Sequence, residues 1–242
     1  MKTLVLASRN GKETLRDQIN LFFGIGFPVI LLLLLTIIQS NAPVVLFPID
    51  KLDSGISVFG LSFLSLFSGV LIAKDRTSSF MVRLLVAPLT SSDFIFGYTV
   101  PMVVLQGVAC FTVAFSLGLD VSINVMPAIV VLVPASVLFI AMGLLASSLF
   151  NEKQVGGVCG ALLTNLSAWL SGTWFDLDLV GGAFKRVAEA LPFVCAVNAA
   201  RAALSGNYSS VFPDLWWVIG YAAVIMMIAI LVFTRKTNSD NT

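Results

Sequence analysis

The sequence predicts an all-α integral membrane protein with six transmembrane helices. Hydrophobic residues make up 58% of the 242 residues and charged residues only 11%, whereas soluble domains carry about 45–50% and about 25%. Apolar stretches of roughly twenty residues, long enough to cross a bilayer as helices, recur along the chain. The polar stretches between them are too short to fold separately, so we expect a single transmembrane domain over residues 1–242.

Six stretches have the length and apolar character of a membrane-spanning helix. In chain order they are residues 21–39, 54–73, 94–119, 125–150, 154–175 and 215–234. The first is too long for a secretory signal, so we expect it to be retained. Residues 187–200 are also apolar, but Glu189 adds a charge and Pro192 interrupts them. We therefore expect broken or re-entrant helices in an outer segment, residues 173–213, between the last two spans.

The basic residues indicate which loops face the cytoplasm, because short cytoplasmic loops are rich in Lys and Arg. With six spans, both termini, the loop near Lys74 and the loop near Asn151 lie on one side. That side carries every Lys and Arg of the chain except Lys51, Lys185, Arg186 and Arg201. Both termini are therefore expected in the cytoplasm.

Residues 1–20 form an amphipathic segment ahead of the first span. Apolar or small residues fall near one helical face: Leu4, Gly11, Leu15, Ile19 and Phe22. Charged residues fall near the other: Arg9, Lys12, Glu13 and Arg16. Two interpretations fit this pattern. One is a cytoplasmic helix in the headgroup plane with its basic residues near anionic lipid, and the other is a solvated leader.

The segment KDRTSSFMVRLLVAP interrupts the apolar chain between the second and third predicted spans. Its apolar residues Phe80, Met81, Leu84 and Leu85 have the spacing of one helical face. Pro88 ends the helix, because the residue before a proline avoids helical backbone angles. Within residues 74–90 we therefore expect a short amphipathic helix on the cytoplasmic face. A docking surface and an ordinary interfacial helix that only fixes orientation fit equally well.

Composition argues against several kinds of active site. The chain has no histidine and no G-x-x-x-x-G-K-[ST] phosphate-binding loop. Cys110, Cys159 and Cys195 have neither metal-ligand nor disulfide spacing. The predicted spans are essentially free of ionisable groups, which disfavours a membrane-integral enzyme or an ion-driven transporter. We expect no catalytic, cofactor-binding or metal-binding residues.

The stretch AKDRTSSFMVRLLVAPLTSSDFIFGYTV, residues 73–100, resembles the segment after the second span in ABC-2 type permeases. These are the membrane subunits of one class of ATP-binding-cassette transporter. The matching residues are Asp75-Arg76, Ser78-Ser79, Arg83-Leu84-Leu85, Ala87-Pro88-Leu89-Thr90 and Gly97-Tyr98. The chain departs from the family pattern at Ser79, where many members have Gly, and at Met81 and Val82, where Glu is common.

The resemblance implies the permease subunit of a bacterial ABC exporter in the cell membrane. It would move a lipophilic or amphipathic compound, peptide or glycolipid outward. It implies no cofactor in this chain, because ATP and Mg would bind a separate ATPase subunit. The expected partners are ABC ATPase subunits, a second permease subunit as homodimer or related heterodimer, and the lipid bilayer, but no nucleic acid. The alternatives are a non-transporting membrane anchor or immunity protein, or a secondary transporter.

The resemblance also assigns roles to residues. The coupling helix, which carries the motion of the ATPase to the spans, would include Lys74, Asp75, Arg76, Phe80, Arg83, Leu84, Leu85 and Pro88. Residues 151–154 would either contact the ATPase or form a plain charged connection. Residues of spans two and five would line the substrate path and the permease interface: Ser62, Ser65, Phe67, Asn165, Ser167 and Trp169. Asn165 fits a helix–helix hydrogen bond equally well.

Overall fold

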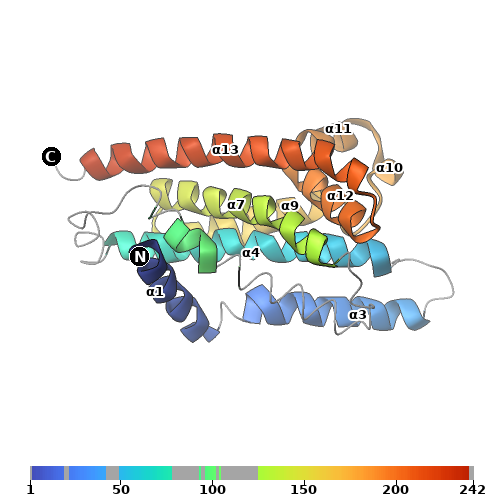
Figure 1. The fold of residues 1–242 in the computed structure, drawn as a ribbon, viewed down its shortest axis with the longest axis horizontal. Coiled ribbons are helices and arrows are strands. Elements are labelled where there is room, and N and C mark those ends of the chain that lie inside the picture. Colours follow the sequence, from blue (N-terminus) through green and yellow to red (C-terminus); the bar gives the residue numbers. More distant parts are fainter. Residues whose placement is uncertain are drawn as a thin grey trace.

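The structure is a computed structural model that describes residues 2–18, 22–41, 49–77, 93, 96–101, 104 and 125–239. Every regular element within these ranges is a helix, which confirms the all-helical class. The bundle is built around α4 (Ile49–Thr77), α7 (Val125–Leu149) and α13 (Tyr208–Ser239). These three helices run in the same direction, and α3 (Phe27–Asn41) runs the opposite way beside them (Figure 1).

Within the described residues, three helices are long and apolar enough to cross a membrane: Ser54–Arg76, Met126–Leu149 and Tyr208–Phe233. They coincide with the second, fourth and sixth predicted spans. The first predicted span contains the π-helix η1 (Phe22–Gly26) and the shorter apolar helix α3. The fifth is a run of α8 (Glu152–Gly157), the π-helix η2 (Val158–Leu163) and α9 (Thr164–Leu170). Most of the third lies outside the described residues, so the count of six stays a prediction.

The N-terminal helix α1 (Lys2–Arg16) and the end of α13 lie toward the same end of the bundle (Figure 1). An even number of membrane crossings produces this arrangement. The chain enters α3 from that end, and α4, α7 and α13 each return toward it. The parallel direction of these three helices is what alternating crossings require of the second, fourth and sixth spans.

The break predicted at Pro192 is present. Here α11 (Gly182–Ala190) and α12 (Pro192–Leu204) meet at a bend of 75°. Leu191 is extended, with φ −93° and ψ 151°, because a residue before proline avoids helical angles. The hydroxyl of Tyr221 on α13 donates to the carbonyl of Ala190 at 2.8 Å. The short helix α10 (Leu177–Val180) precedes this bent pair.

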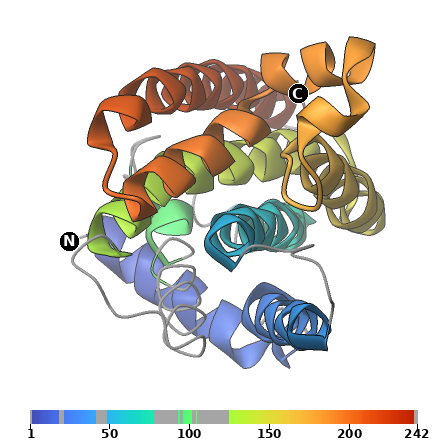
Figure 2. The ribbon, with the colours of Figure 1, turned by 90° about the vertical axis from the view of Figure 1, so that its right-hand side faces the viewer.

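Helix α4 forms the centre of the bundle, with α7 and α3 on different sides of it (Figure 2). In the most apolar window of α4, 83% of residues are buried, against 17% for α13. The crossing of α4 and α7 is close at Gly143, where an added Cβ would lie 2.4 Å from the carbonyl oxygen of Ser65. Apolar side chains such as Leu61, Leu138 and Phe139 fill this core.

Candidate functional site

The N-terminal helix α1 packs on the bundle through one face and leaves an apolar stripe exposed. Its buried face carries Leu6, Ala7, Asn10 and Thr14. Leu4, Val5 and Leu15 are exposed by 69%, 70% and 54%. The apolar side that the sequence assigned through Leu4 and Leu15 therefore points away from the protein. The face that packs on the bundle contains two polar residues, and these belong to the site.

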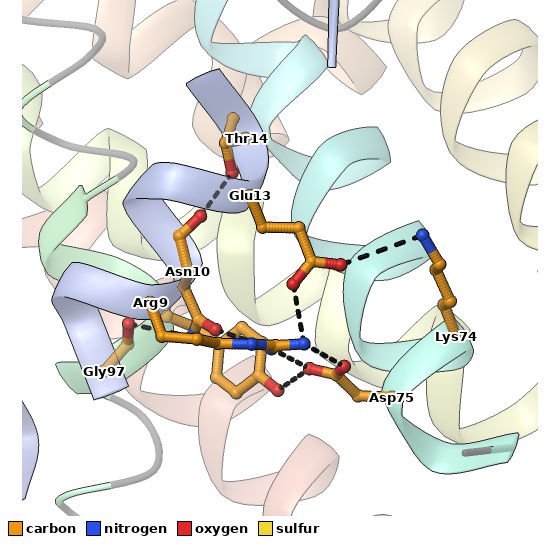
Figure 3. Close-up of polar contacts among 8 residues, drawn as sticks. Arg9, Asn10, Glu13, Thr14, Lys74, Asp75 and Gly97 are labelled. Carbon is orange, nitrogen blue, oxygen red and sulfur yellow. Dashed lines mark hydrogen bonds and ion pairs between the residues drawn. The ribbon is translucent and has the colours of Figure 1, made fainter. Parts of the chain in front are cut away.

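The centre of the site is Asp75, a carboxylate in the last turn of α4 that is only 2% exposed. The guanidinium of Arg9 donates to both of its oxygens, with distances of 2.6 Å from Nη1 to Oδ2 and 2.8 Å from Nη2 to Oδ1 (Figure 3). The hydroxyl of Tyr98, which is 1% exposed, donates to Oδ2 at 2.5 Å. A buried carboxylate is costly unless it is paired and hydrogen-bonded, and these donors satisfy that need.

Arg9 is itself held in place by its neighbours on α1. Its Nη1 donates to Oδ1 of Asn10 at 2.8 Å, and its Nη2 lies 2.6 Å from Oε2 of Glu13. Partial burial lowers the pKa of Arg9, but the hydrogen bond and charge of Asp75 and the charge of Glu13 raise it by more. The pKa therefore lies above the usual arginine value, and the guanidinium is charged at any physiological pH.

The same face of α1 contacts the start of the third predicted span. Asn10, which has no exposed surface, donates from Nδ2 to the carbonyl of Gly97 at 3.1 Å. A Cβ added at Gly97 would lie 2.5 Å from Cδ2 of Leu6, so a side chain at this position would force Leu6 to shift. Thr3 also donates from its hydroxyl to the carboxylate of Asp93. We call the residues joined by these polar contacts the Arg9 cluster: Arg9, Asn10, Glu13, Lys74, Asp75, Gly97 and Tyr98.

Arg76 points to a different neighbour from Asp75. Its Nη1 donates to the carbonyls of Ser147 and Ser148 at 2.6 and 3.0 Å. These carbonyls belong to the last turn of α7, where backbone acceptors lack partners within the helix and a cation is favoured by the helix dipole. Arg76 therefore caps the C-terminus of α7.

A cavity of about 520 Å³ lies between α1, α4 and α8. Three apolar residues of α4 line it, Phe67, Val70 and Leu71. Charged residues line it as well, Lys74 from α4, Arg16 from α1 and Glu152 from α8 among them. The charged lining residues carry both signs. This composition gives no preference for an anionic or a cationic occupant.

The predicted coupling residues fall into two groups. Lys74, Asp75 and Arg76 lie in the last turn of α4. Lys74 is exposed, and its Nζ lies 3.7 Å from Oε1 of Glu13. Phe80, Arg83, Leu84, Leu85 and Pro88 lie outside the described residues. Their assignment to a coupling helix stays a prediction.

The residues predicted for a substrate path on α4 are buried in this conformation. Ser62 and Ser65 have no exposed surface, and each hydroxyl donates at 2.6 Å to a carbonyl of the preceding turn. Phe67 is 4% exposed and ends a row of aromatic rings on α4. In that row Phe63 lies 5.4 Å from Phe59 and 6.3 Å from Phe67, measured between ring centroids.

Two of the predicted residues of the fifth span are on the outside of the bundle. Trp169 is 54% exposed, and Asn165 is exposed and donates from Nδ2 to the carbonyl of Ala161 at 2.6 Å. Ser167 is buried and bonds to Thr164 of its own helix. The structure therefore does not bring Asn165 and Trp169 together with the buried serines of α4 on one surface.

Residues 151–154 have a local structural role. The side chain of Asn151 accepts from the backbone N–H of Gln154, and the side chain of Gln154 accepts from the backbone N–H of Asn151. This reciprocal pair is a capping box, which satisfies free N–H groups at the start of α8. Glu152 and Lys153 are exposed.

Sequence reasoning missed Arg9, Asn10 and Tyr98 as members of a site. The predicted second span, residues 54–73, ended before Asp75, whereas the candidate span of the structure continues to Arg76 and so includes this buried carboxylate. One feature of the sequence could have indicated that Asn10 is buried. It lies on the same helical face as Leu6, four residues before it, and Thr14, four residues after it. The partner of Arg9 is 66 positions away and leaves no local pattern.

The described part of the chain thus forms an apolar helical bundle with candidate membrane spans, and a cluster of largely buried polar contacts joins α1 to the last turn of α4 and to Gly97 and Tyr98. This defines an integral membrane protein. Residues 1–205 match the family described as ABC-2 type transporter, and the chain belongs to that family. It is a transport subunit, and its place is in a membrane. A comparison with curated proteins gives no match.

Proposed function

We propose that this chain is the permease subunit of an ABC exporter, driven by ATP hydrolysis on a separate nucleotide-binding subunit. Membership of the ABC-2 family supports a permease. The absence of a phosphate-binding loop from the sequence supports a separate ATPase. ATP and Mg would bind that partner. The location that fits is the bacterial cell membrane with both termini in the cytoplasm, as the basic residues favour.

The observation that carries this proposal is the way the loop after α4 is anchored. Asp75 on one side of residues 78–92 is hydrogen-bonded to Tyr98 on the other side, and Arg76 caps α7. A loop with a fixed base can transmit a push from a partner to the helices that hold it. We propose that residues 74–90 form the coupling helix that contacts the ATPase. Arg83 and the apolar residues Phe80, Leu84 and Leu85 would provide that contact.

We further propose that two permease subunits face each other and that a lipophilic or amphipathic substrate passes outward along spans two and five. The row of aromatic rings on α4 supports an apolar route: Phe59, Phe63 and Phe67. The buried positions of Ser62 and Ser65 imply that the helices packed on α4 must move away from it before these serines could meet a substrate. Asn165 and Trp169, being exposed on α9, would face the second subunit or the route itself.

The test is to co-purify the permease with its ATPase subunit from membranes and to measure ATP hydrolysis. We expect Arg83→Glu to reduce the amount of bound ATPase at least about tenfold, which corresponds to about 1.4 kcal/mol of binding free energy. Arg235→Glu is the matched control, because Arg235 is an exposed cation near the end of α13. It should leave the complex intact.

The competing functions predict different results. A membrane anchor or immunity protein needs no ATPase, so charge reversal at Arg83 would leave its activity unchanged. A secondary transporter would work in membranes without ATP. Either result, together with failure of the wild-type permease to bind or stimulate an ATPase, would contradict the proposal.

A further inference from the structure

We propose that the cavity between α1, α4 and α8 binds a resident phospholipid of the surrounding bilayer, one whose headgroup carries both a phosphate and a primary ammonium. Phosphatidylethanolamine is the lipid with this chemistry. Such a site goes beyond the proposed function, because a lipid can occupy it whether or not an ATPase is present. The fit depends on where the cavity lies along α4, on the order of its apolar and charged lining residues, and on the balance of its charges.

The wall that α4 gives to the cavity is a single helical face. Phe67, Val70, Leu71 and Lys74 line the cavity, and residues three and four apart are neighbours on the surface of a helix. The face is apolar at Phe67 and becomes charged at Lys74, close to the end of the helix at Thr77. A phospholipid has the same order of groups, from its acyl chains to its headgroup, so it can lie along this face with like groups in contact.

The wall also lies at the depth where a lipid headgroup meets the hydrocarbon. Lys74 is in the last turn of the candidate span Ser54–Arg76, which places it at the level of the headgroups. Phe67 lies about 10 Å deeper, at a rise of about 1.5 Å per residue. The headgroup layer is about 5–8 Å thick on each side of the bilayer. The wall therefore covers this layer and the outermost part of the hydrocarbon.

The three walls of the cavity are fixed by contacts outside it. Helix α8 packs on α4 through the fully buried Val155, whose Cγ1 would lie 2.9 Å from a Cβ added at Gly69. Helix α1 is held to α4 by the bidentate contact of Arg9 with Asp75. The volume of about 520 Å³ is within the range of about 300–1,000 Å³ for small-molecule pockets. A pocket with fixed walls loses little free energy to ordering when a ligand binds.

The charges around the cavity favour a headgroup that carries both signs. The described lining contains three acidic and two basic residues: Glu13, Asp17 and Glu152, and Arg16 and Lys74. Glu13 lies 2.6 Å from Arg9 and 3.7 Å from Lys74 (Figure 3), whereas the carboxylates of Asp17 and Glu152 are on exposed residues. An anionic headgroup would meet these carboxylates, and a cationic one would meet the basic residues. A headgroup with both charges can place each beside the opposite sign.

The type of cation follows from the same lining. A primary ammonium donates hydrogen bonds to carboxylates, whereas a quaternary ammonium is bound by the faces of aromatic rings. The described lining offers the exposed carboxylates of Asp17 and Glu152, and its aromatic ring, Phe67, is only 4% exposed. Lys74, on the same wall as the apolar residues, would contact the phosphate, and Asp17 and Glu152 would contact the ammonium.

The experiment is native mass spectrometry of the complete, delipidated permease in detergent. The protein is titrated separately with phosphatidylethanolamine, phosphatidylcholine and phosphatidylglycerol that have the same acyl chains. We expect the first phosphatidylethanolamine to bind at least about threefold more tightly than either of the other lipids, within the range for exposed pairs of charges. Phosphatidylcholine lacks the N–H donors, and phosphatidylglycerol lacks the cation.

Variants separate the two halves of the headgroup. Lys74→Gln should weaken phosphatidylethanolamine and phosphatidylcholine alike, by at least about threefold, because both lipids carry the phosphate. Asp17→Asn combined with Glu152→Gln should abolish the preference for phosphatidylethanolamine over phosphatidylcholine. The matched controls are Lys153→Gln and Glu189→Gln, exposed residues that are not part of the described lining. Both controls should keep the affinities of the wild type.

Equal affinity of the wild type for the three lipids, or tighter binding of phosphatidylglycerol, would overturn the proposal. So would an unchanged preference for phosphatidylethanolamine in the variant that lacks both carboxylates. These results do not involve an ATPase, so a permease that binds no ATPase would refute the proposed function and leave the lipid site standing.

A second measurement separates a resident lipid from a transported one. The complex of permease and ATPase is reconstituted in vesicles that contain phosphatidylethanolamine labelled on an acyl chain. ATP should leave the distribution of the labelled lipid between the two leaflets unchanged. Movement of the lipid that depends on ATP would show that it is cargo and would contradict its assignment as a resident lipid.

Discussion

Arg76 gives the sharpest test of the structure, because its two possible roles predict opposite results. The guanidinium donates to the carbonyls of Ser147 and Ser148 at 2.6 and 3.0 Å and caps α7. A hydrogen bond from a charged group contributes about 1.5–3 kcal/mol, and a cation at a helix C-terminus contributes about 0.3–1 kcal/mol. Because one nitrogen makes both bonds, we count one full bond and the dipole term. Arg76→Met should therefore lower the free energy of unfolding by about 2–4 kcal/mol.

The assay is thermal unfolding of the purified permease in detergent, without its ATPase. For a chain of this size, about 1 kcal/mol corresponds to about 2–4 °C, so the midpoint should fall by roughly 4–16 °C. The unfolding midpoint of Arg76→Lys should lie between those of the wild type and Arg76→Met, since an ammonium keeps the charge but cannot reproduce the planar guanidinium donors. Arg16→Met, on the exposed side of α1, is the control. An unchanged midpoint in Arg76→Met, combined with loss of ATPase binding, would show that Arg76 contacts the partner and does not cap α7.

Three further predictions use the same unfolding assay. Gly143→Ala should destabilise the protein by about 1–3 kcal/mol, because the added Cβ would lie 2.4 Å from a backbone carbonyl oxygen of α4. The control is Gly156→Ala, where the added Cβ would have nothing within 4 Å and should stabilise the helix by about 0.5–1 kcal/mol. Equal effects of the two substitutions would refute the close crossing of α4 and α7. A double-mutant cycle of Arg9→Gln and Asp75→Asn should give a coupling energy of about 0.5–3 kcal/mol, whereas additive effects would exclude the pairing. Tyr221→Phe should cost about 1 kcal/mol and increase amide exchange in α11, and unchanged exchange there would mean that its hydrogen bond to α11 is absent.

The long apolar helices could be predicted from the sequence because hydropathy is a property of local composition. The helices at Ser54–Arg76, Met126–Leu149 and Tyr208–Phe233 follow directly from apolar runs. The sequence predicted the positions of the helix ends less accurately. Helix α4 begins at Ile49 and reaches Thr77, beyond the apolar run at both ends, because buried contacts allow polar residues to continue the helix. The break at Pro192 was predictable for a different reason: proline restricts the residue before it, whatever the fold.

The Arg9 cluster could not be predicted, because its contacts depend on packing between distant segments. On a helical wheel Arg9 belongs with the charged side of α1, which suggests contact with solvent or lipid headgroups. The structure instead directs it to Asp75 through a bidentate contact across 66 positions. Gly97 shows the same limit, since its lack of a side chain matters only because Leu6 lies over it.

The adjacent residues Asp75 and Arg76 have a physical explanation that does not require a partner protein. Successive residues of an α-helix point about 100° apart, so the two side chains reach different neighbours. Asp75 is bound by α1 and the third span, and Arg76 is bound by the end of α7. Opposite charges are needed because one residue meets a guanidinium and the other meets carbonyls at a helix C-terminus. The charged pair therefore fixes how the loop base is oriented in the bundle. If the loop docks on an ATPase, the specificity of docking must come from residues further along it, and Arg83 is the charged residue of the predicted helix that could supply it.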